Sequence, residues 1–173
     1  MNLIDIILKR RSIRDYTCDE IPEENIQRIL EAGLLAPTSR NRKPCEFIVV
    51  KNKDVLLKLS KSKASGSTML KDCDTAIVVA ADSDKSDTWI EDSSIALAYM
   101  DLMANSLNIG CCWCQSHLRF DANDNSSESV IKEILSLENK YRIVGILSLG
   151  VKEFDLEPHN LSEIDESKIR YVK

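Results

Sequence analysis

Apolar residues along the chain follow two patterns, one typical of helices and one of strands. Helical spacing of apolar positions predicts helices over residues 3–8, 22–34, 54–61, 87–107 and 127–137. Short runs that are apolar on both faces predict buried strands over residues 46–51, 75–81, 111–116 and 142–151. Because helices alternate with strands whose two faces both need covering, the pattern predicts a three-layer α/β-type sandwich.

Two stretches depart from this regular alternation. From Ile95 to Leu107 the longest expected helix is apolar on nearly every side, which is typical of a helix inside a domain or at a subunit interface. Residues 152–173 are polar with scattered apolar side chains, so this tail cannot build its own core. We expect the tail to be disordered or to pack against a partner surface. No repeat or linker divides the chain, which predicts one domain over residues 1–173.

Composition narrows the class of protein. The 173 residues are 43% hydrophobic and 29% charged, as is ordinary for a soluble globular protein, and the net charge of −5 disfavours general nucleic-acid binding. No apolar run approaches the ~18 residues that a membrane helix needs. The first apolar residues precede the positive charges, whereas a secretory signal has the opposite order. We therefore expect a cytoplasmic protein without a membrane or nucleic-acid partner.

Six cysteines invite a metal-binding interpretation, which their spacing does not favour. The cluster Cys111-Cys112-Trp113-Cys114 lacks the second pair or the spaced histidines of a zinc site, and only His117 lies nearby. We expect buried, reduced thiols and no metal. The five glycines form neither G-x-G-x-x-G nor a P-loop pattern, so the sequence does not predict a nucleotide site of those kinds.

The segment Lys9 to Tyr16 is the strongest candidate for a binding site. It carries Lys9, Arg10, Arg11 and Arg14 around the hydroxyl of Ser12. If the chain is extended from Arg10 onward, Arg10, Ser12 and Arg14 share one face, and two guanidinium forks beside a hydroxyl suit a phosphate group. The alternatives are a solvated basic run at the end of a helix, or a nucleic-acid contact with strongly salt-dependent binding.

Residues spread over most of the chain carry a resemblance to a known family. They are Arg10-Arg11-Ser12-Ile13-Arg14, Ile21-Pro22-Glu23, Ile26, Ile29-Leu30, Ala32-Gly33, Ala36-Pro37-Thr38-Ser39-Arg40-Asn41, Pro44, Phe47-Ile48-Val49-Val50, Asp92, Ala96, Met100, Leu107, Gly110-Cys111-Cys112-Trp113, Leu149-Gly150 and Lys168-Ile169-Arg170-Tyr171. In order and spacing the chain resembles the nitroreductase family of FMN-dependent oxidoreductases.

The resemblance implies an architecture and a partner. It implies an α+β homodimer, a three-layer α/β/α sandwich around a central four-stranded mixed sheet. The C-terminal arm, residues 152–173, would wrap the partner subunit and add a strand to its sheet. Two FMN molecules would lie at the interface, contacted by both subunits.

The resemblance also assigns residues to the FMN. Arg10, Arg11, Ser12 and Arg14 would bind the phosphate and the ribityl chain. Pro37, Thr38, Ser39 and Asn41 would approach the flavin from the other subunit, and Trp113, Cys114, Gln115 and Ser116 would line the other side of the ring. A C-terminal basic residue (His159, Lys168 or Arg170) is a further candidate for the phosphate. Cys45 stands where many relatives have tryptophan.

The implied activity needs no catalytic side chain. No Ser-His-Asp, Cys-His or paired-carboxylate pattern is visible in the sequence, and flavin N5 would carry the hydride. NAD(P)H would reduce the flavin and leave, and a nitroaromatic, quinone or similar acceptor would take its place in a ping-pong cycle. A flavin-binding protein without turnover, or another flavin reaction such as reductive dehalogenation, remains an alternative.

Overall fold

The computed structural model describes residues 2–173 and contains five α-helices, four strands and four short 3-10 turns in that range. The helices are α1 (Leu3–Lys9), α2 (Glu23–Leu34), α3 (Lys53–Leu59), α4 (Trp89–Ser106) and α5 (Ser127–Leu135), and the strands are β1 (Cys45–Val50), β2 (Thr75–Asp82), β3 (Gly110–Gln115) and β4 (Tyr141–Gly150). Every helix and strand expected from the apolar pattern is present, with ends that differ by one to a few residues.

The sheet has the strand order β1-β2-β4-β3, and each neighbouring pair is antiparallel. The expectation of a mixed sheet is therefore wrong. Strands β2, β3 and β4 are mostly buried because helices cover both faces, and such burial does not require parallel neighbours. The expectation that the first strand is buried on both faces is also wrong, because β1 is an edge strand that is only partly buried and its Val49 is 40% exposed. One parallel pairing occurs beside the sheet, an isolated bridge between Ser12 and Cys111.

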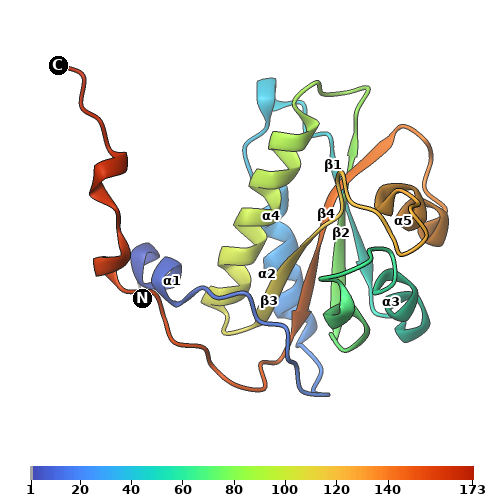
Figure 1. Cartoon of the computed structure of the whole chain (residues 1–173), viewed down its shortest axis with the longest axis horizontal. Helices are drawn as coiled ribbons and strands as arrows, with labels where there is room; N and C mark the ends of the chain where they lie inside the picture. The colour runs from blue at the N-terminus through green and yellow to red at the C-terminus, as the bar shows by residue number, and fades with distance from the viewer. Residues whose placement is uncertain (1) are drawn as a thin grey trace.

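Two layers of helices enclose one continuous sheet, which gives the three-layer sandwich that the pattern predicted. Helices α2 and α4 cover one face, and α3 and α5 cover the other (Figure 1). Each face has its own apolar core, one built around Leu97 and Met100 of α4 and the other around Leu56 of α3 and Ile131 of α5. The central strand β2 is buried along its whole length, so it fixes the two layers relative to each other.

The segment after α1 runs along the outer edge of β3. The backbone N–H of Ile13 donates to the Cys111 carbonyl (2.9 Å), and the buried Ile13 side chain packs beneath it. The Tyr16 hydroxyl donates to the Ile13 carbonyl (2.7 Å) and also contacts Ser148 Oγ of β4 (2.7 Å). The basic residues of this segment are thereby fixed at a sheet edge.

Helix α4 is buried on the side that faces the sheet and exposed on another side. Leu97, Met100 and Ala104 are fully buried, whereas Ile95 and Tyr99 are exposed. The helix is long and apolar, yet no helix within residues 2–173 has the length and hydropathy needed to cross a membrane. The buried side of α4 agrees with the first expectation, a helix inside a domain, and the subunit interface stays a prediction.

The C-terminal tail is tied to the body only at its beginning. Backbone hydrogen bonds join Thr17 to Val151 (2.9 Å) and His159 to Leu8 (2.8 Å). Beyond Asn160 the chain stands away from the sandwich and forms only the 3-10 turns η3 (Leu161–Glu163) and η4 (Glu166–Lys168) (Figure 1). Its apolar side chains are exposed, among them Leu161, Ile164, Ile169, Tyr171 and Val172.

Candidate functional site

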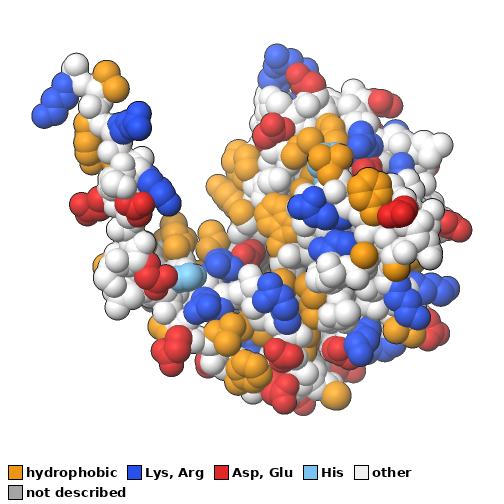
Figure 2. Space-filling model, viewed as in Figure 1, with side chains coloured by type: hydrophobic (Ala, Val, Ile, Leu, Met, Phe, Trp, Pro, Cys, Tyr) orange, Lys and Arg blue, Asp and Glu red, His pale blue; other side chains and the backbone are white. Residues whose placement is uncertain are grey.

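Several Lys and Arg side chains lie on the face of the sandwich shown in Figure 2, next to the point where the C-terminal tail leaves it. This is the side of the molecule where the segment from Arg10 to Arg14 runs along β3. The sheet edge therefore presents positive charge on a protein whose net charge is negative. Such an edge suits an anionic ligand.

Arg10 lies on the α4 side of β3. It is the C-cap residue directly after α1, and its Nη1 lies 3.7 Å from Asp101 Oδ2 on α4. Asp101 also accepts hydrogen bonds from Cys111 Sγ (2.8 Å) and Asn105 Nδ2 (3.0 Å). Burial raises the pKa of the Asp101 carboxyl, while the Cys111 hydrogen bond and the charge of Arg10 act in the opposite direction.

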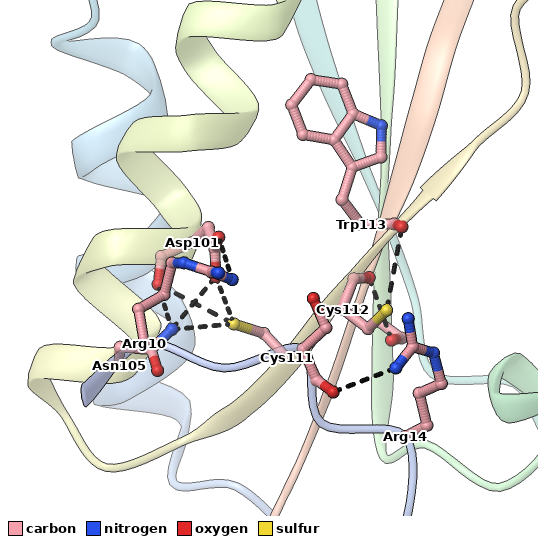
Figure 3. Close-up of polar contacts among 9 residues, drawn as sticks. Arg10, Arg14, Asp101, Asn105, Cys111, Cys112 and Trp113 are labelled. Carbon is pink, nitrogen blue, oxygen red and sulfur yellow. Dashed lines mark hydrogen bonds and ion pairs between the residues drawn. The ribbon is translucent and has the colours of Figure 1, made fainter. Parts of the chain in front are cut away.

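Arg14 lies on the other side of the same strand. Arg14 lies near Cys112, which belongs to the core on the α3 and α5 side. Burial raises the pKa of the Cys112 thiol, and the positive charge of Arg14 acts in the opposite direction. Figure 3 shows Arg10 beside Asp101 and Cys111, and Arg14 beside Cys112. The exposed Arg14 guanidinium also donates to the Ser12 carbonyl (3.2 Å).

The expected shared face of Arg10, Ser12 and Arg14 is therefore wrong. Arg10 is the C-cap residue that follows α1, and its guanidinium lies beside Asp101 of α4, whereas Arg14 lies beside Cys112. Only Ser12 and Tyr16 make bridge pairings in this segment. The two arginines flank β3 from opposite sides instead of forming one fork around a single group.

Arg11 and Ser12 occupy the positions between these two arginines. Arg11 Nη1 donates to the Glu157 carbonyl and so fastens the first part of the tail to the body. Ser12 is paired with Cys111 through the backbone and makes a side-chain contact with the Cys112 thiol. Ser12 thus lies at the sheet edge between the two cations, while Arg11 is directed to the tail.

Lys63 is a further cation at this edge that the sequence pattern did not indicate. Its Nζ donates to the Gln115 carbonyl (3.2 Å), and its charge opposes the rise in pKa that burial causes at Cys114. Lys63 lies in an irregular loop between α3 and η2 (Thr68–Lys71), where no periodicity marks it. Asp101 did carry a signal, since it is a lone charge in the apolar half of the α4 pattern.

Trp113 and Gln115 come together on the α4 face of β3. Trp113 Nε1 donates to Gln115 Oε1 (3.1 Å), and Gln115 Nε2 donates to the His117 carbonyl (3.3 Å). Both polar groups of the Gln115 side chain are thus engaged at the strand end. Half-buried Trp113 keeps part of its indole accessible beside this pair.

Cys114 and Ser116 are buried and cannot offer their side chains in the same way. Cys114 packs in the core of the α3 and α5 layer, and its thiol donates to the Gly66 carbonyl (3.4 Å). The backbone N–H of Ser116 donates to the Val144 carbonyl (2.8 Å). The expected lining of the site by residues 113–116 thus divides into two accessible side chains and two buried ones.

The loop from Pro37 to Asn41 lies at the opposite end of α4. The backbone N–H of Ser39 donates to Asp92 Oδ1 (2.8 Å), and Thr38 Oγ1 accepts from the N–H of Lys43 (3.0 Å). Asp92 is buried and also accepts from Ser86 Oγ (2.8 Å). Pro37 and Asn41 are exposed, while Thr38 and Ser39 are half-buried.

One chain therefore holds the expected site in two separate parts. The loop is anchored at Asp92 and the basic segment at Asp101, and nine residues of helix span about 14 Å. The C-terminal candidates differ in position. His159 lies beside the start of the basic segment, where its backbone N–H donates to the Leu8 carbonyl (2.8 Å), and its side chain pairs with Glu163 (2.9 Å). Further along the tail, Lys168 pairs with Asp165 (3.7 Å) and Arg170 is exposed.

A three-layer α+β sandwich with a cationic segment along an edge strand defines a class of proteins that can bind an anionic ligand. The chain belongs to the nitroreductase family, whose family model matches residues 7–70 and 60–151.

Known proteins of that family are similar over nearly the whole chain. A solved structure described as an FMN-dependent nitroreductase from Clostridium difficile R20291 is 39% identical, with a TM-score of 0.94, and the match covers 98% of this chain and 99% of that one. An Archaeoglobus fulgidus protein, provisionally named NADH dehydrogenase/NAD(P)H nitroreductase, is 34% identical over 151 residues, which are 85% of this chain and 83% of the relative. A nitroreductase family protein from Clostridium difficile 630 is 27% identical with a TM-score of 0.77, covering 99% and 94% of the two chains.

Proposed function

We propose that this protein is an FMN-dependent oxidoreductase that transfers hydride from NAD(P)H to a nitroaromatic, a quinone or a similar acceptor. The observation that carries the proposal is the basic segment from Arg10 to Arg14, held along the edge of β3 beside Trp113. The names of the relatives support the same activity, since they include an FMN-dependent nitroreductase and an NAD(P)H nitroreductase.

The residues at the sheet edge fit the chemistry of FMN. Arg10 is assigned to the phosphate, because guanidinium groups bind phosphate oxygens with strong, directional hydrogen bonds. Arg14 and Lys63 are assigned to the ring end, because they lie on the other side of β3 and beside the carbonyl of Gln115. Cations there would stabilise negative charge on the ring. Thr38, Ser39 and Asn41 would reach the flavin held mainly by a second subunit.

The bound FMN would accept hydride from NAD(P)H and pass electrons to the acceptor. The chain's own contribution is to orient the cofactor, to exclude water beneath the ring and to supply positive charge. Both substrates would use the same accessible side of the site in turn, which gives ping-pong kinetics. Parallel double-reciprocal plots are the expected result, and intersecting plots would contradict the shared site.

The proposed active form is a homodimer. The exposed apolar residues of α1 and α4 surround a depression of about 360 Å³ whose lining includes Leu3, Tyr99 and Leu102. Large apolar patches of this kind mark protein interfaces. The tail, residues 152–173, would extend across the partner, which would bring each basic segment close to the Pro37–Asn41 loop of the other subunit.

Arg14→Ala tests the cofactor site directly. The purified parent is expected to be yellow and to release FMN on denaturation. The variant should hold FMN about ten- to a hundredfold more weakly, because a charge-assisted hydrogen bond is lost. Its unfolding midpoint should barely change, since Arg14 is exposed. Fluorescence titration of the cofactor-free protein with FMN measures the effect.

Lys58→Ala, an exposed cation on α3, is the control and should bind FMN like the parent. Equal FMN affinity in Arg14→Ala and the parent would show that the ring-end assignment is wrong. A protein that binds FMN without oxidising NADH or NADPH would instead be a flavin-binding protein without turnover.

A further inference from the structure

Asp101 is the one charged residue in the second half of α4, and it is the ion-pair partner of Arg10. We infer that Asp101 is a positioning residue, which holds the Arg10 guanidinium in place for the phosphate of FMN. The inference rests on the proposed function, because it requires Arg10 to be the phosphate ligand. It adds a part of the site that does not itself contact the cofactor.

The carboxylate is held in one orientation by two donors. Cys111 Sγ donates to Oδ1 (2.8 Å), and Asn105 Nδ2 donates to the same oxygen (3.0 Å). Cys111 is fully buried on β3, and Asn105 is one turn further along α4. Figure 3 shows the three side chains and Arg10 converging on one point between α4 and the basic segment. The second oxygen, Oδ2, is thereby left to face Arg10.

Arg10 has few other constraints. Within residues 2–173, Asp101 is the sole partner at hydrogen-bond or ion-pair distance from its guanidinium, and 31% of the Arg10 side chain is exposed. An arginine side chain loses considerable rotamer freedom when it is fixed. Because Asp101 limits that freedom before the ligand arrives, less entropy is lost when the phosphate binds.

The ion pair also leaves most of the guanidinium available. The contact between Nη1 and Oδ2 is 3.7 Å, longer than a hydrogen bond, and a guanidinium carries five N–H donors. The carboxylate can therefore orient Arg10 without occupying the donors that a phosphate needs. A purely structural role, in which Asp101 only joins α4 to β3, would not distinguish one flavin from another.

Comparison of FMN with riboflavin separates these two roles, because riboflavin has the ring and the ribityl chain but no phosphate. Asp101→Asn preserves the shape of the side chain and removes its charge. Titration of the cofactor-free homodimer should show FMN bound about fivefold more weakly than by the parent, with riboflavin affinity unchanged. In an Arg10→Ala background the same substitution should have no further effect on FMN, because the two residues act as one unit.

Three further variants keep the test decisive. Cys111→Ser retains a donor to Asp101 and should keep the preference of the parent for FMN, whereas Cys111→Ala should lose part of it. Glu138→Gln, which removes an exposed pair with Lys140 (3.3 Å) away from this edge, is the matched control and should leave both affinities unchanged. If Asp101→Asn does not fold, the comparison of Cys111→Ser with Cys111→Ala decides the question.

The outcomes distinguish the inference from the proposed function. A parent that prefers FMN over riboflavin, together with an Asp101→Asn variant that keeps the full preference, would overturn the positioning role alone. Equal weakening of FMN and riboflavin in that variant would assign Asp101 to the structure of the sheet edge, which also overturns it. A parent that binds neither flavin would overturn the proposed function and the inference with it.

Discussion

Left-handed backbone is concentrated at one place that the proposed site uses. Of the seven non-glycine residues with positive φ within residues 2–173, Arg40 (52°), Asn41 (55°) and Lys43 (47°) lie in the loop before β1. Each such residue costs about 1–2 kcal/mol relative to the right-handed conformation. The hydrogen bond from Ser39 to buried Asp92 helps to hold this loop in place. Strain that is retained in this way is typical of functional loops.

Buried thiols give the fold a defined sensitivity to alkali. Burial raises the pKa of Cys73 to about 12, so the folded thiol keeps its proton where an unfolded thiol, with a pKa of 9.0, has lost it. Stability from this group is complete below pH 9 and is lost as the pH rises toward 12. Each pH unit in that window should lower the free energy of unfolding by up to about 1.4 kcal/mol.

Urea unfolding at several pH values between about 8 and 11 measures the free energy of unfolding across the range in which thiols titrate, and so checks this prediction. Cys73→Ser removes the titrating group and should reduce the slope of stability against pH. An unchanged slope would show that Cys73 does not contribute. Cys18 is exposed, so Cys18→Ser should leave the slope as it is in the parent.

At the scale of single residues, the sequence predicted which segment carries the binding residues better than it predicted the side of the strand on which each side chain lies. The basic segment was expected to be extended, and in the structure it pairs with β3 at Ser12, but Arg10 and Arg14 lie on opposite sides of β3. The side on which each arginine lies depends on where α1 ends and on the opposite cores to which the neighbouring Cys111 and Cys112 belong. Asp101 and Lys63 join the site through tertiary contacts, which spacing along the chain does not encode.

At the scale of elements the apolar pattern was sufficient to predict all helices and strands. It could not predict the direction of the strands, since burial on both faces is the same for parallel and antiparallel neighbours. It also predicted that the longest helix extends to residue 107, one residue beyond the end of α4 at Ser106. In the structure Asn108 makes the left-handed turn (φ 61°), and Gly110 is already in β3, where a Cβ would approach Ile13 Cγ2 to 3.0 Å.

The pairing of β3 with β4 depends on a glycine beneath Trp113. A Cβ added at Gly145 would lie 2.5 Å from Trp113 Nε1 and 2.8 Å from the Cys114 carbonyl. Gly145→Ala should therefore displace the indole from Gln115 and destabilise the fold by about 1–3 kcal/mol. The urea midpoint measures this loss.

Gly33→Ala on α2 is an informative comparison. Its Cβ would meet the flexible side chain of Met100 at 2.9 Å, and alanine favours a helix by about 0.5–1 kcal/mol. The loss should be clearly smaller than at Gly145. Equal stability of Gly145→Ala and the parent would show that β3 can shift without cost.

At the scale of the whole molecule, one chain shows two partial sites and a tail without a core. The sequence predicted such a tail because its apolar residues are too few and too scattered to fold alone. The spacing of these apolar residues does not encode which surface they pack against. The dimer, in which a second chain would supply that surface, is therefore a proposal. The separation of Asp92 from Asp101 along α4 gives that proposal a physical reason, because a second chain would complete each site.

Removal of the tail after Asn160 tests this arrangement. The truncated protein should keep its sandwich, because residues 161–173 are all exposed and contribute nothing to either core. It should dimerise more weakly and lose FMN more readily than the full chain. Light scattering after size-exclusion chromatography, with absorbance of the bound flavin, measures both effects. A truncated protein with an unchanged dimer and unchanged colour would contradict the role of the tail.

Within residues 2–173, backbone hydrogen bonds anchor the tail at Leu8 and Thr17, and none joins it to the sandwich beyond Asn160, which has a kinetic consequence. The sandwich can fold as an independent unit at a rate that does not depend on how many molecules are present. Ordering of the last thirteen residues would require an encounter with another molecule. Recovery of the holoenzyme after denaturation should then include a second-order phase, which would slow on dilution and limit how soon newly made protein gains its colour.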